Sequence, residues 1–206
     1  MNSDSKKPIL DETTVDKNPF HQFEKWYGEA YRISDEDASA MTLVTASGKQ
    51  PNARIVYLRG SDKKGFWFFT NYNSRKGKEL TENATACLLF FWPRLLRQVK
   101  MLGYVEKLSR KESDNYFSLR PRESQISAWA SPQSKPIPNR ETLNAWVDEY
   151  IRIFEGKKIS RPAHWGGYRF VPVCFEFWYG RESRLHDRIK FTKQKSGKWK
   201  IERLSP

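Results

Sequence analysis

Residues 40–71, AMTLVTASGKQPNARIVYLRGSDKKGFWFFTN, decide the fold class of this chain. β-Branched and aromatic side chains are frequent in segments 41–47, 53–59 and 66–71, a composition typical of strands. The links SGKQPN and SDKKG contain the glycine, proline, asparagine and aspartate residues that favour turns. Because links this short join neighbouring antiparallel strands, the stretch predicts two successive β-hairpins.

The rest of the chain adds strands of the same kind. ATACLLFFW, which ends at Trp92, is a continuous apolar run and predicts a fully buried strand. RQVKMLGYVEKLS predicts a strand with a bulge at Gly103. The segment PVCFEFWYGRESRLHDRIKFTKQKSGKWKIERL predicts three strands with a hairpin at KSGK. Because open sheet edges are a liability, such a set of mostly antiparallel strands is expected to close into a barrel or fold into a sandwich.

Five segments carry helical patterns. The first begins at Pro19, and the second begins at Ser74. Ser109 and Glu112 have the spacing of a capping box, which predicts a helix to about residue 119. Two further helices are expected near 122–131 and in ETLNAWVDEYIRIFEG. The fold class is therefore mainly β with helices (α+β), with a flexible arm at 1–18 and a single domain at 19–206.

Composition limits the class of protein. The 206 residues include no apolar run long enough to cross a bilayer, and the first residues lack an apolar signal core, so we expect a cytoplasmic protein. Cys87 and Cys174 lie in apolar runs and are expected to be small buried residues. The net charge is +13, but the lysines are dispersed beside turn residues. This dispersal favours a solvated surface over a specific nucleic-acid site, and we expect no membrane partner.

Three basic motifs could bind anions. Arg75 and Lys76 stand at a helix start, where their charges are unfavourable unless an anion lies between them. The alternative is that both side chains simply extend into water. Arg120 in SLRPRESQ presents the same two possibilities at a helix junction. In RLHDR, the basic residues Arg184, His186 and Arg188 occupy every second position. On a strand, all three would therefore share one face. Neither metal-ligand spacing nor a phosphate-binding glycine loop occurs in the sequence.

Eight ordered blocks resemble the pyridoxamine 5′-phosphate oxidase family. They are NPFHQFEKWYGEA, ARIVYLRG, FFTNYNSRKGKEL, RQV, YFSLRPRESQISAWASPQS, HWGGYRF, FEFWYGRESRLHDR and WKIERLSP. RPRESQISAWASPQS and EFWYGRESRLHDR are the most specific of these. The resemblance runs from about residue 19 to the end, and it implies an antiparallel, homodimeric split β-barrel that binds flavin mononucleotide (FMN) at the subunit interface.

The resemblance also implies site residues. The FMN contacts would be Arg54, Ile55, Val56, Tyr57, Leu58, Arg59, Phe69, Thr70, Arg75, Lys76, Gln98, Gln133, Ser134, Trp178 and Arg188. The substrate contacts would be Arg59, Tyr116, Arg120, Ser124, Arg184, Leu185 and His186. Within these sets, Arg54, Arg75 and Lys76 would hold the FMN phosphate. Arg184 and His186 would form the catalytic pair over the pyridine ring of the substrate.

The implied activity is FMN-dependent oxidation of pyridoxamine or pyridoxine 5′-phosphate to pyridoxal 5′-phosphate, with O₂ as acceptor and H₂O₂ as product. Three features depart from the family pattern: Arg59 stands where lysine is usual, Phe69 stands where tyrosine is usual, and residues 1–18 lack an Arg-x-x-Tyr motif. A binding protein that holds flavin or nucleic acid without turnover is the alternative, supported by the surplus positive charge. The aromatic residues fall at core-like spacing and not between the basic groups, which favours the oxidase.

Overall fold

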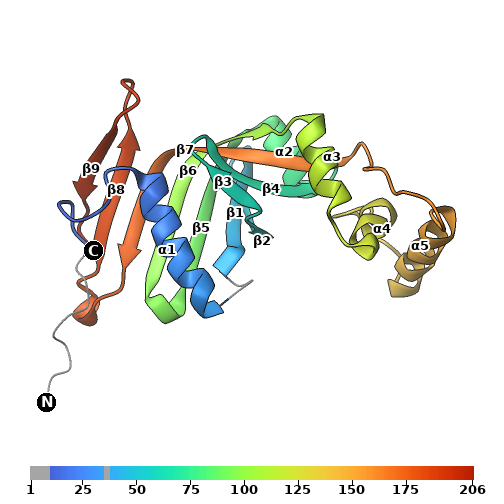
Figure 1. Ribbon diagram of the computed structural model, residues 1–206, viewed down its shortest axis with the longest axis horizontal. Helices are drawn as coiled ribbons and strands as arrows, with labels where there is room; N and C mark the ends of the chain where they lie inside the picture. Colours follow the sequence, from blue (N-terminus) through green and yellow to red (C-terminus); the bar gives the residue numbers. More distant parts are fainter. Residues whose placement is uncertain (1–9, 35–37) are drawn as a thin grey trace, which may run out of the picture.

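The computed structural model describes residues 10–34 and 38–206 and contains a nine-stranded antiparallel sheet (Figure 1). Seven strands follow the order β2-β1-β5-β6-β7-β4-β3, while β8 pairs with β7 and β9 pairs with β8. The strands are β1 (Ala40–Ser47), β2 (Gln50–Tyr57), β3 (Gly60–Asp62), β4 (Gly65–Asn71), β5 (Thr85–Trp92), β6 (Arg97–Lys107), β7 (Trp165–Tyr179), β8 (Asp187–Lys193) and β9 (Trp199–Arg203). The hairpin predicted between 41–47 and 53–59 is present as β1 and β2. The second predicted hairpin, between 53–59 and 66–71, is wrong, because β4 pairs with the short β3, which the prediction missed, and β2 and β4 are not neighbours in the strand order.

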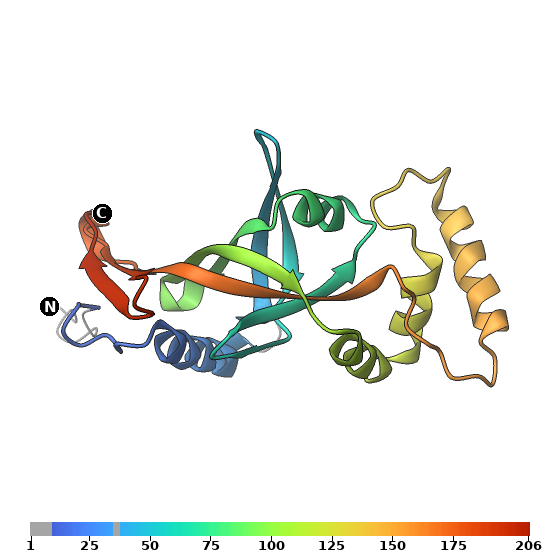
Figure 2. The same cartoon turned by 90° about the horizontal axis from the view of Figure 1, so that it is seen from above.

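Strand β7 connects the two ends of the molecule (Figure 2). Its first residues, 165–170, pair with β4, whereas residues 174–179 pair with β8. At about 3.3 Å per residue, β7 extends over roughly 45 Å. The predicted irregularity at Gly103 is confirmed, because the pairing of β6 with β7 shifts register between Leu102 and Gly103. A Cβ atom on Gly103 would lie 2.1 Å from the carbonyl oxygen of Val171, so the backbones can approach this closely only at glycine.

The described residues form five α-helices: α1 (Pro19–Ser34), α2 (Arg75–Glu82), α3 (Arg110–Ser118), α4 (Arg122–Ala130) and α5 (Arg140–Ile153). The apolar face of α1 covers the barrel, where the ring of Phe23 packs edge-on against Phe66 and Phe90 at 4.8 and 5.1 Å. Ser74 caps α2, and Ser109 forms the predicted capping box with Glu112 at the start of α3. Helices α4 and α5 lie side by side at the far end (Figures 1 and 2).

The prediction that β5 is fully buried is wrong. Burial alternates along the strand, and Phe91 is 54% exposed. The neighbouring β6 presents Leu102 and Tyr104 on the same outward face, at 45% and 40% exposure. Alternate residues of the apolar run therefore contribute to an apolar face that the rest of the described chain leaves partly exposed.

The strand predicted through Arg184 and His186 is also wrong. Residues Glu182–Arg184 form a 3₁₀ turn, labelled η3, and β8 begins only at Asp187. Ser183 and Arg184 have positive φ angles of 52° and 60°, which the reversal between β7 and β8 requires. Only Arg188 lies on the strand, so the three basic side chains do not share one strand face.

Residues 10–18 of the predicted flexible arm lie against the rest of the chain, and the first nine residues are outside the described part. Leu10 and Val15 are buried in the main core. Arg203 of β9 donates to the backbone carbonyl of Leu10 at 3.1 Å and binds Glu12 at 3.0 Å. Apolar burial and this ion pair explain why the segment is ordered. None of the helices in the described residues is long and apolar enough to span a membrane.

Candidate active site

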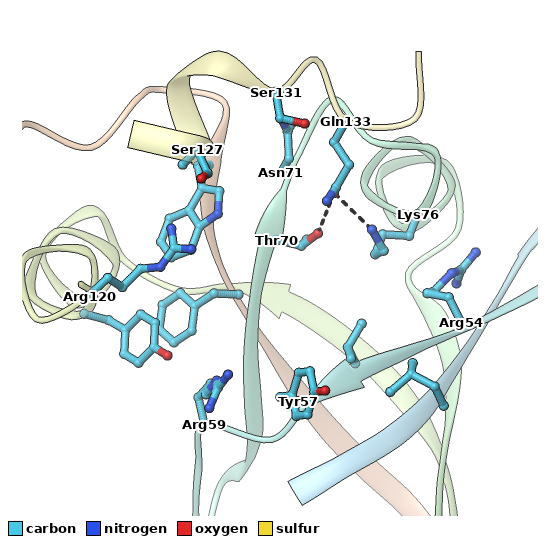
Figure 3. A pocket seen from close by; sticks show the side chains of 16 residues that line it. Arg54, Tyr57, Arg59, Thr70, Asn71, Lys76, Arg120, Ser127, Ser131 and Gln133 are labelled. Atoms are coloured by element: carbon cyan, nitrogen blue, oxygen red, sulfur yellow. Dashed lines mark hydrogen bonds between the residues drawn. The ribbon is translucent and has the colours of Figure 1, made fainter. Parts of the chain in front are cut away.

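A cavity of about 440 Å³ lies between β2, β4, α2 and the junction of α3 with α4 (Figure 3). The predicted FMN residues that line it are Arg54, Ile55, Val56, Tyr57, Arg59, Phe69, Thr70, Lys76 and Gln133. Tyr116 and Arg120 from the predicted substrate site also line it. The structure therefore brings together residues from segments that are more than 70 positions apart in the chain.

One wall of the cavity is organised by Glu79, a buried residue of α2. Its Oε2 accepts hydrogen bonds from Thr45 at 2.5 Å and Arg54 at 3.1 Å. Its Oε1 accepts from Arg75 at 3.0 Å and Asn52 at 3.1 Å. Burial alone would raise the pKa of this carboxyl, but the hydrogen bonds and the charge of Arg54 outweigh it and lower the pKa to about 2.

Lys76 continues this wall toward β4. Its ammonium group donates to Gln133 at 3.1 Å and to Ser74 at 3.4 Å. The same Gln133 oxygen accepts a hydrogen bond from Thr70 at 3.3 Å (Figure 3). Burial lowers the pKa of Lys76, and the charge of Arg54 lowers it further, while Glu79 opposes both. This wall therefore presents two cationic groups, Arg54 and Lys76, beside polar hydrogen-bonding side chains, and Arg75 is linked to it through Glu79.

The opposite wall combines cations with stacked rings. Phe69 and Tyr116 stack with ring centroids 3.8 Å apart and planes inclined by 7°. The guanidinium of Arg120 lies over the ring of Trp165 at 4.5 Å, and Arg59 lies over Tyr57 at 5.2 Å. Burial lowers the pKa of Arg120, and its buried Nη1 has no hydrogen-bond partner among the described residues. An unsatisfied buried guanidinium nitrogen costs free energy unless a ligand accepts its hydrogen bond.

A second group of predicted residues lies at the other end of β7. Gln98, Trp178 and Arg188 are direct neighbours on β6, β7 and β8. Arg188 binds the buried Glu176 through Nε at 3.0 Å and Nη2 at 2.8 Å, and Lys100 binds the same carboxylate at 2.6 Å. Burial would raise the pKa of Glu176, but these basic partners lower it.

His186 belongs to this second group and has a defined hydrogen-bonding pattern. Its ring packs on Trp178 with centroids 4.7 Å apart. The backbone N–H of Arg181 donates to Nδ1 of His186 at 3.0 Å. A backbone amide can only donate, so the neutral ring carries its proton on Nε2. Arg184 and Leu185 are exposed beside it, and Leu185 is 71% exposed.

The predicted residues thus fall into two separate groups in one chain. The cavity lining does not include the predicted residues Gln98, Trp178, Arg184, His186 and Arg188. The distance from Trp165 to Trp178 along β7 is roughly 40 Å for an extended strand. Leu58 is buried in the core, Ser124 is half-buried on α4, and Ser134 is exposed with a φ of 69°.

Some residues that build the cavity were not predicted from the sequence. Asn71, Ser127, Ala128, Ser131 and Trp165 line it, and Glu79 supports it from behind. The spacing of Arg75 and Glu79, four positions apart on α2, is a detectable signal for an ion pair. The contacts of Glu79 with β1 and β2 depend on tertiary packing and have no local sequence signal.

Comparisons with known proteins identify the family of the chain. Residues 29–152 match the family model described as pyridoxamine 5′-phosphate oxidase. This chain belongs to that family. Residues 165–206 match a model described as the C-terminal dimerisation region of pyridoxine 5′-phosphate oxidase. The family expected from the sequence is therefore confirmed.

Several members of the pyridoxamine 5′-phosphate oxidase family are similar over nearly the whole chain. Pyridoxine/pyridoxamine 5′-phosphate oxidases from Nostoc punctiforme and Cupriavidus necator are each 52% identical to it, covering 96% of this chain and 92% and 93% of theirs. PhzG from Burkholderia lata, solved with tetrahydrophenazine-1-carboxylic acid, is 28% identical, with a TM-score of 0.89 over 96% of this chain and 98% of that one.

A related FMN-binding protein from Nostoc punctiforme, 14% identical, has the same fold with a TM-score of 0.72 over 92% of this chain and 98% of its own. These neighbours confirm the split-barrel fold class.

Proposed function

We propose that the protein oxidises pyridoxamine and pyridoxine 5′-phosphate to pyridoxal 5′-phosphate, with FMN as its cofactor and O₂ as the final acceptor. Bound FMN would supply the two-electron acceptor for a hydride from the C4′ carbon, with O₂ as the final oxidant and H₂O₂ as its product; the amine substrate would first give an imine, which water hydrolyses with release of ammonia. The observation that carries the proposal is the cavity with basic groups on two facing walls, because cofactor and substrate each bring one phosphate.

The Glu79 wall fits the FMN phosphate. Arg54 and Lys76 line the cavity there, and Arg75 starts the helix α2, whose first N–H groups also favour an anion. Thr70 and Gln133 add hydrogen-bonding groups at the cavity surface beside them. The residues present therefore suit a phosphorylated flavin.

The opposite wall fits the phosphate of the substrate. Arg120 offers a buried Nη1 that lacks a partner among the described residues, and this atom would donate to a phosphate oxygen. Arg59 replaces the usual lysine with a planar guanidinium group, which can bind a phosphate through two parallel hydrogen bonds. The stacked Phe69 and Tyr116 rings would form an apolar boundary that limits the access of water to the bound substrate.

The second group of residues would complete the site from a partner subunit. Arg184 and His186 lie at the opposite end of β7 from the cavity, so a single chain does not join them to it. The match to a dimerisation region and the exposed apolar residues Phe91, Leu102 and Tyr104 support a homodimer. The location in the cytoplasm stays a prediction from sequence.

Within that completed site, Arg184 would orient the pyridine ring, and His186 would donate a hydrogen bond through Nε2. The Nδ1 lone pair of His186 is used by the Arg181 amide, so the neutral ring has no free lone pair for a substrate proton. His186 would therefore position the substrate and not act as a general base. Most of the catalysis would arise from orientation of the reacting carbon.

The absorbance spectrum of the purified protein under anaerobic conditions tests this function. We expect a yellow protein whose flavin absorbance bleaches when pyridoxine 5′-phosphate is added and returns, with H₂O₂, when air is admitted. Pyridoxine without the phosphate is the matched control and should bleach it far more slowly. A yellow protein that pyridoxine 5′-phosphate and pyridoxamine 5′-phosphate leave unchanged would contradict the oxidase assignment and favour a flavin-binding protein.

A further inference from the structure

The carboxylate of Glu79 joins three elements behind the cavity. Its side chain is only 5% exposed, and it binds Arg54 of β2 and Arg75 of α2 through different oxygens. Thr45 of β1 lies between the two groups, since it donates to Glu79 at 2.5 Å and accepts from Arg54 at 2.6 Å. The position of each guanidinium is therefore coupled to a single buried anion.

Glu79 leaves each arginine with free hydrogen-bond donors. Arg75 uses only its Nε on Glu79, and its four terminal N–H groups have no hydrogen-bond partner among the described residues. Arg54 donates from Nη1 to Thr45 and to the carbonyl of Leu43, and from Nη2 to Glu79. Its Nε and one N–H of Nη2 stay available. The carboxylate thus fixes both guanidinium groups without using all of their donors.

An amide could not replace this carboxylate. Oε1 of Glu79 accepts from Arg75 and Asn52, and Oε2 accepts from Arg54 and Thr45, so both oxygens face arginine donors. A glutamine has one carbonyl oxygen and one NH₂ group. In either orientation of the glutamine amide, its NH₂ group would face one of the two arginines. Both groups are hydrogen-bond donors, so no hydrogen bond could form there. One arginine would then lose its anchor.

We infer that Glu79 is a positioning residue that sets the preference of this protein for flavins carrying a 5′-phosphate. It couples the position of Arg54, which lines the cavity, to that of Arg75 at the start of α2, so that both can donate to a phosphate monoester, and this role rests on the function proposed above. Glu79 also opposes the lowering of the Lys76 pKa by burial and Arg54, so it helps to keep that ammonium charged. The competing effect is electrostatic: removal of one negative charge would attract any anion more strongly.

The test compares FMN with riboflavin, which lacks the phosphate, by titrating the flavin-free full-length protein and following flavin fluorescence. Glu79→Gln should weaken FMN binding about tenfold, close to the loss of one charge-assisted hydrogen bond. Riboflavin affinity should stay within about twofold because the isoalloxazine ring would not contact this group. If Glu79 had only a structural role, Glu79→Gln would instead lower the affinities for FMN and riboflavin by similar factors.

Glu82→Gln is the matched control. Glu82 is exposed on the same helix and accepts a hydrogen bond only from Ser47 among the described residues, at 3.1 Å, so the change removes the same charge without touching an arginine. If Glu79→Gln leaves the ratio of FMN affinity to riboflavin affinity unchanged, or raises the affinity for FMN, the positioning role is wrong.

If Glu79→Gln fails to fold, Thr45→Val replaces it. This variant keeps every charge and removes the hydroxyl between Glu79 and Arg54. The ratio of FMN affinity to riboflavin affinity should therefore fall, as it should in Glu79→Gln. An unchanged ratio in Thr45→Val would overturn the inference. If the wild-type protein itself shows no preference for FMN over riboflavin, the proposed phosphate site fails, and the result is distinct from a failure of Glu79 alone.

Discussion

Glu79 and Glu176 are both buried glutamates that bind two basic side chains, yet they lie in very different surroundings. Glu79 joins α2 to β1 and β2 behind a cavity of about 440 Å³. Glu176 lies on the outward face of β7, and its partners Lys100 and Arg188 come from the adjacent strands. A helix packed against two strands can form one side of a concave site, whereas neighbouring residues on one sheet face form a flat surface.

This difference indicates which half of the site can act alone. The Glu79 region encloses space within one chain and presents cations to it, an arrangement that suits an anion. The Glu176 region carries the half-buried Trp178 and His186 and the exposed Arg184 on or beside a sheet face. A flat face contributes to a small-molecule site only when a second surface covers it. The comparison therefore links the proposed roles of Arg184 and His186 to dimer formation.

The largest expected effect is on stability in acid, and it separates the two glutamates. The pKa of Glu79 is lowered from 4.5 to about 2, so its contribution to the free energy of unfolding is present above pH 4.5 and is lost as the pH falls toward about 2. A shift of this size corresponds to roughly 3 kcal/mol. Denaturant unfolding of the flavin-free protein between neutral pH and about pH 2 measures it.

Glu79→Gln should be less stable than the wild-type protein at neutral pH, and the difference should shrink as the pH falls through this range. Glu176→Gln should show the same sign, because the pKa of Glu176 is also lowered, with a smaller change. Equal acid sensitivity of the wild-type protein and Glu79→Gln would show that the carboxylate does not stabilise the fold through its arginines.

The next effect is kinetic and compares an arginine from each region. Arg184→Ala should lower kcat on the order of 10²-fold, since misplacement of the reacting carbon carries a cost of that size. Arg120→Ala should mainly raise KM, because a phosphate contact exists in both the ground state and the transition state. Steady-state kinetics at matched flavin content distinguish the two.

Arg122→Ala provides the control for Arg120. Arg122 is two residues away and binds the backbone carbonyls of Lys157 and Phe154, outside the cavity, so its removal should leave KM nearly unchanged. An Arg184→Ala enzyme with wild-type kcat and KM would remove the η3 turn from the catalytic site.

Much of the fold could be predicted because its signals are local. The strand-favouring composition and turn residues of 40–71, the capping box at Ser109 and the bulge at Gly103 depend on residues close in sequence. The turn at Glu182–Arg184 was missed because its positive φ angles fall on serine and arginine, which carry no such signal. The exposure of Phe91 was missed because an apolar run does not reveal whether a second layer covers it.

The candidate site was predicted as a set of residues but not as an arrangement. The family resemblance implied Arg54, Arg75 and Lys76 together, and the structure brings Arg54 and Lys76 to one cavity wall, with Arg75 linked to Arg54 through Glu79. It could not reveal Glu79 as their common anchor, because Thr45 and Arg54 lie 34 and 25 positions away from it. Contacts of this range are set by how α2 packs on the sheet.

The smallest expected effect is a partial recovery of activity, and it tests directly whether the two regions meet across a dimer. Two defective chains are combined: Arg75→Ala/Lys76→Ala, which should be colourless as a homodimer because its phosphate wall is lost, and Arg184→Ala, which should bind FMN but turn over slowly. In a mixed dimer the intact cavity of the second chain would face the intact Arg184 of the first. One of its two sites would then be complete, so about half of the wild-type activity per dimer should return.

Co-expression with two different affinity tags and sequential purification isolate the mixed dimer, and its activity per dimer, measured with added FMN, is compared with that of each homodimer. Mixed dimers of the wild-type chain with itself, purified in the same way, give the reference value. If each site is built within one chain, the first subunit of the mixed dimer lacks its phosphate wall and the second lacks Arg184, so no activity can return. A mixed dimer as inactive as its parents would therefore separate the η3 turn from the cavity, even though both belong to the same protein.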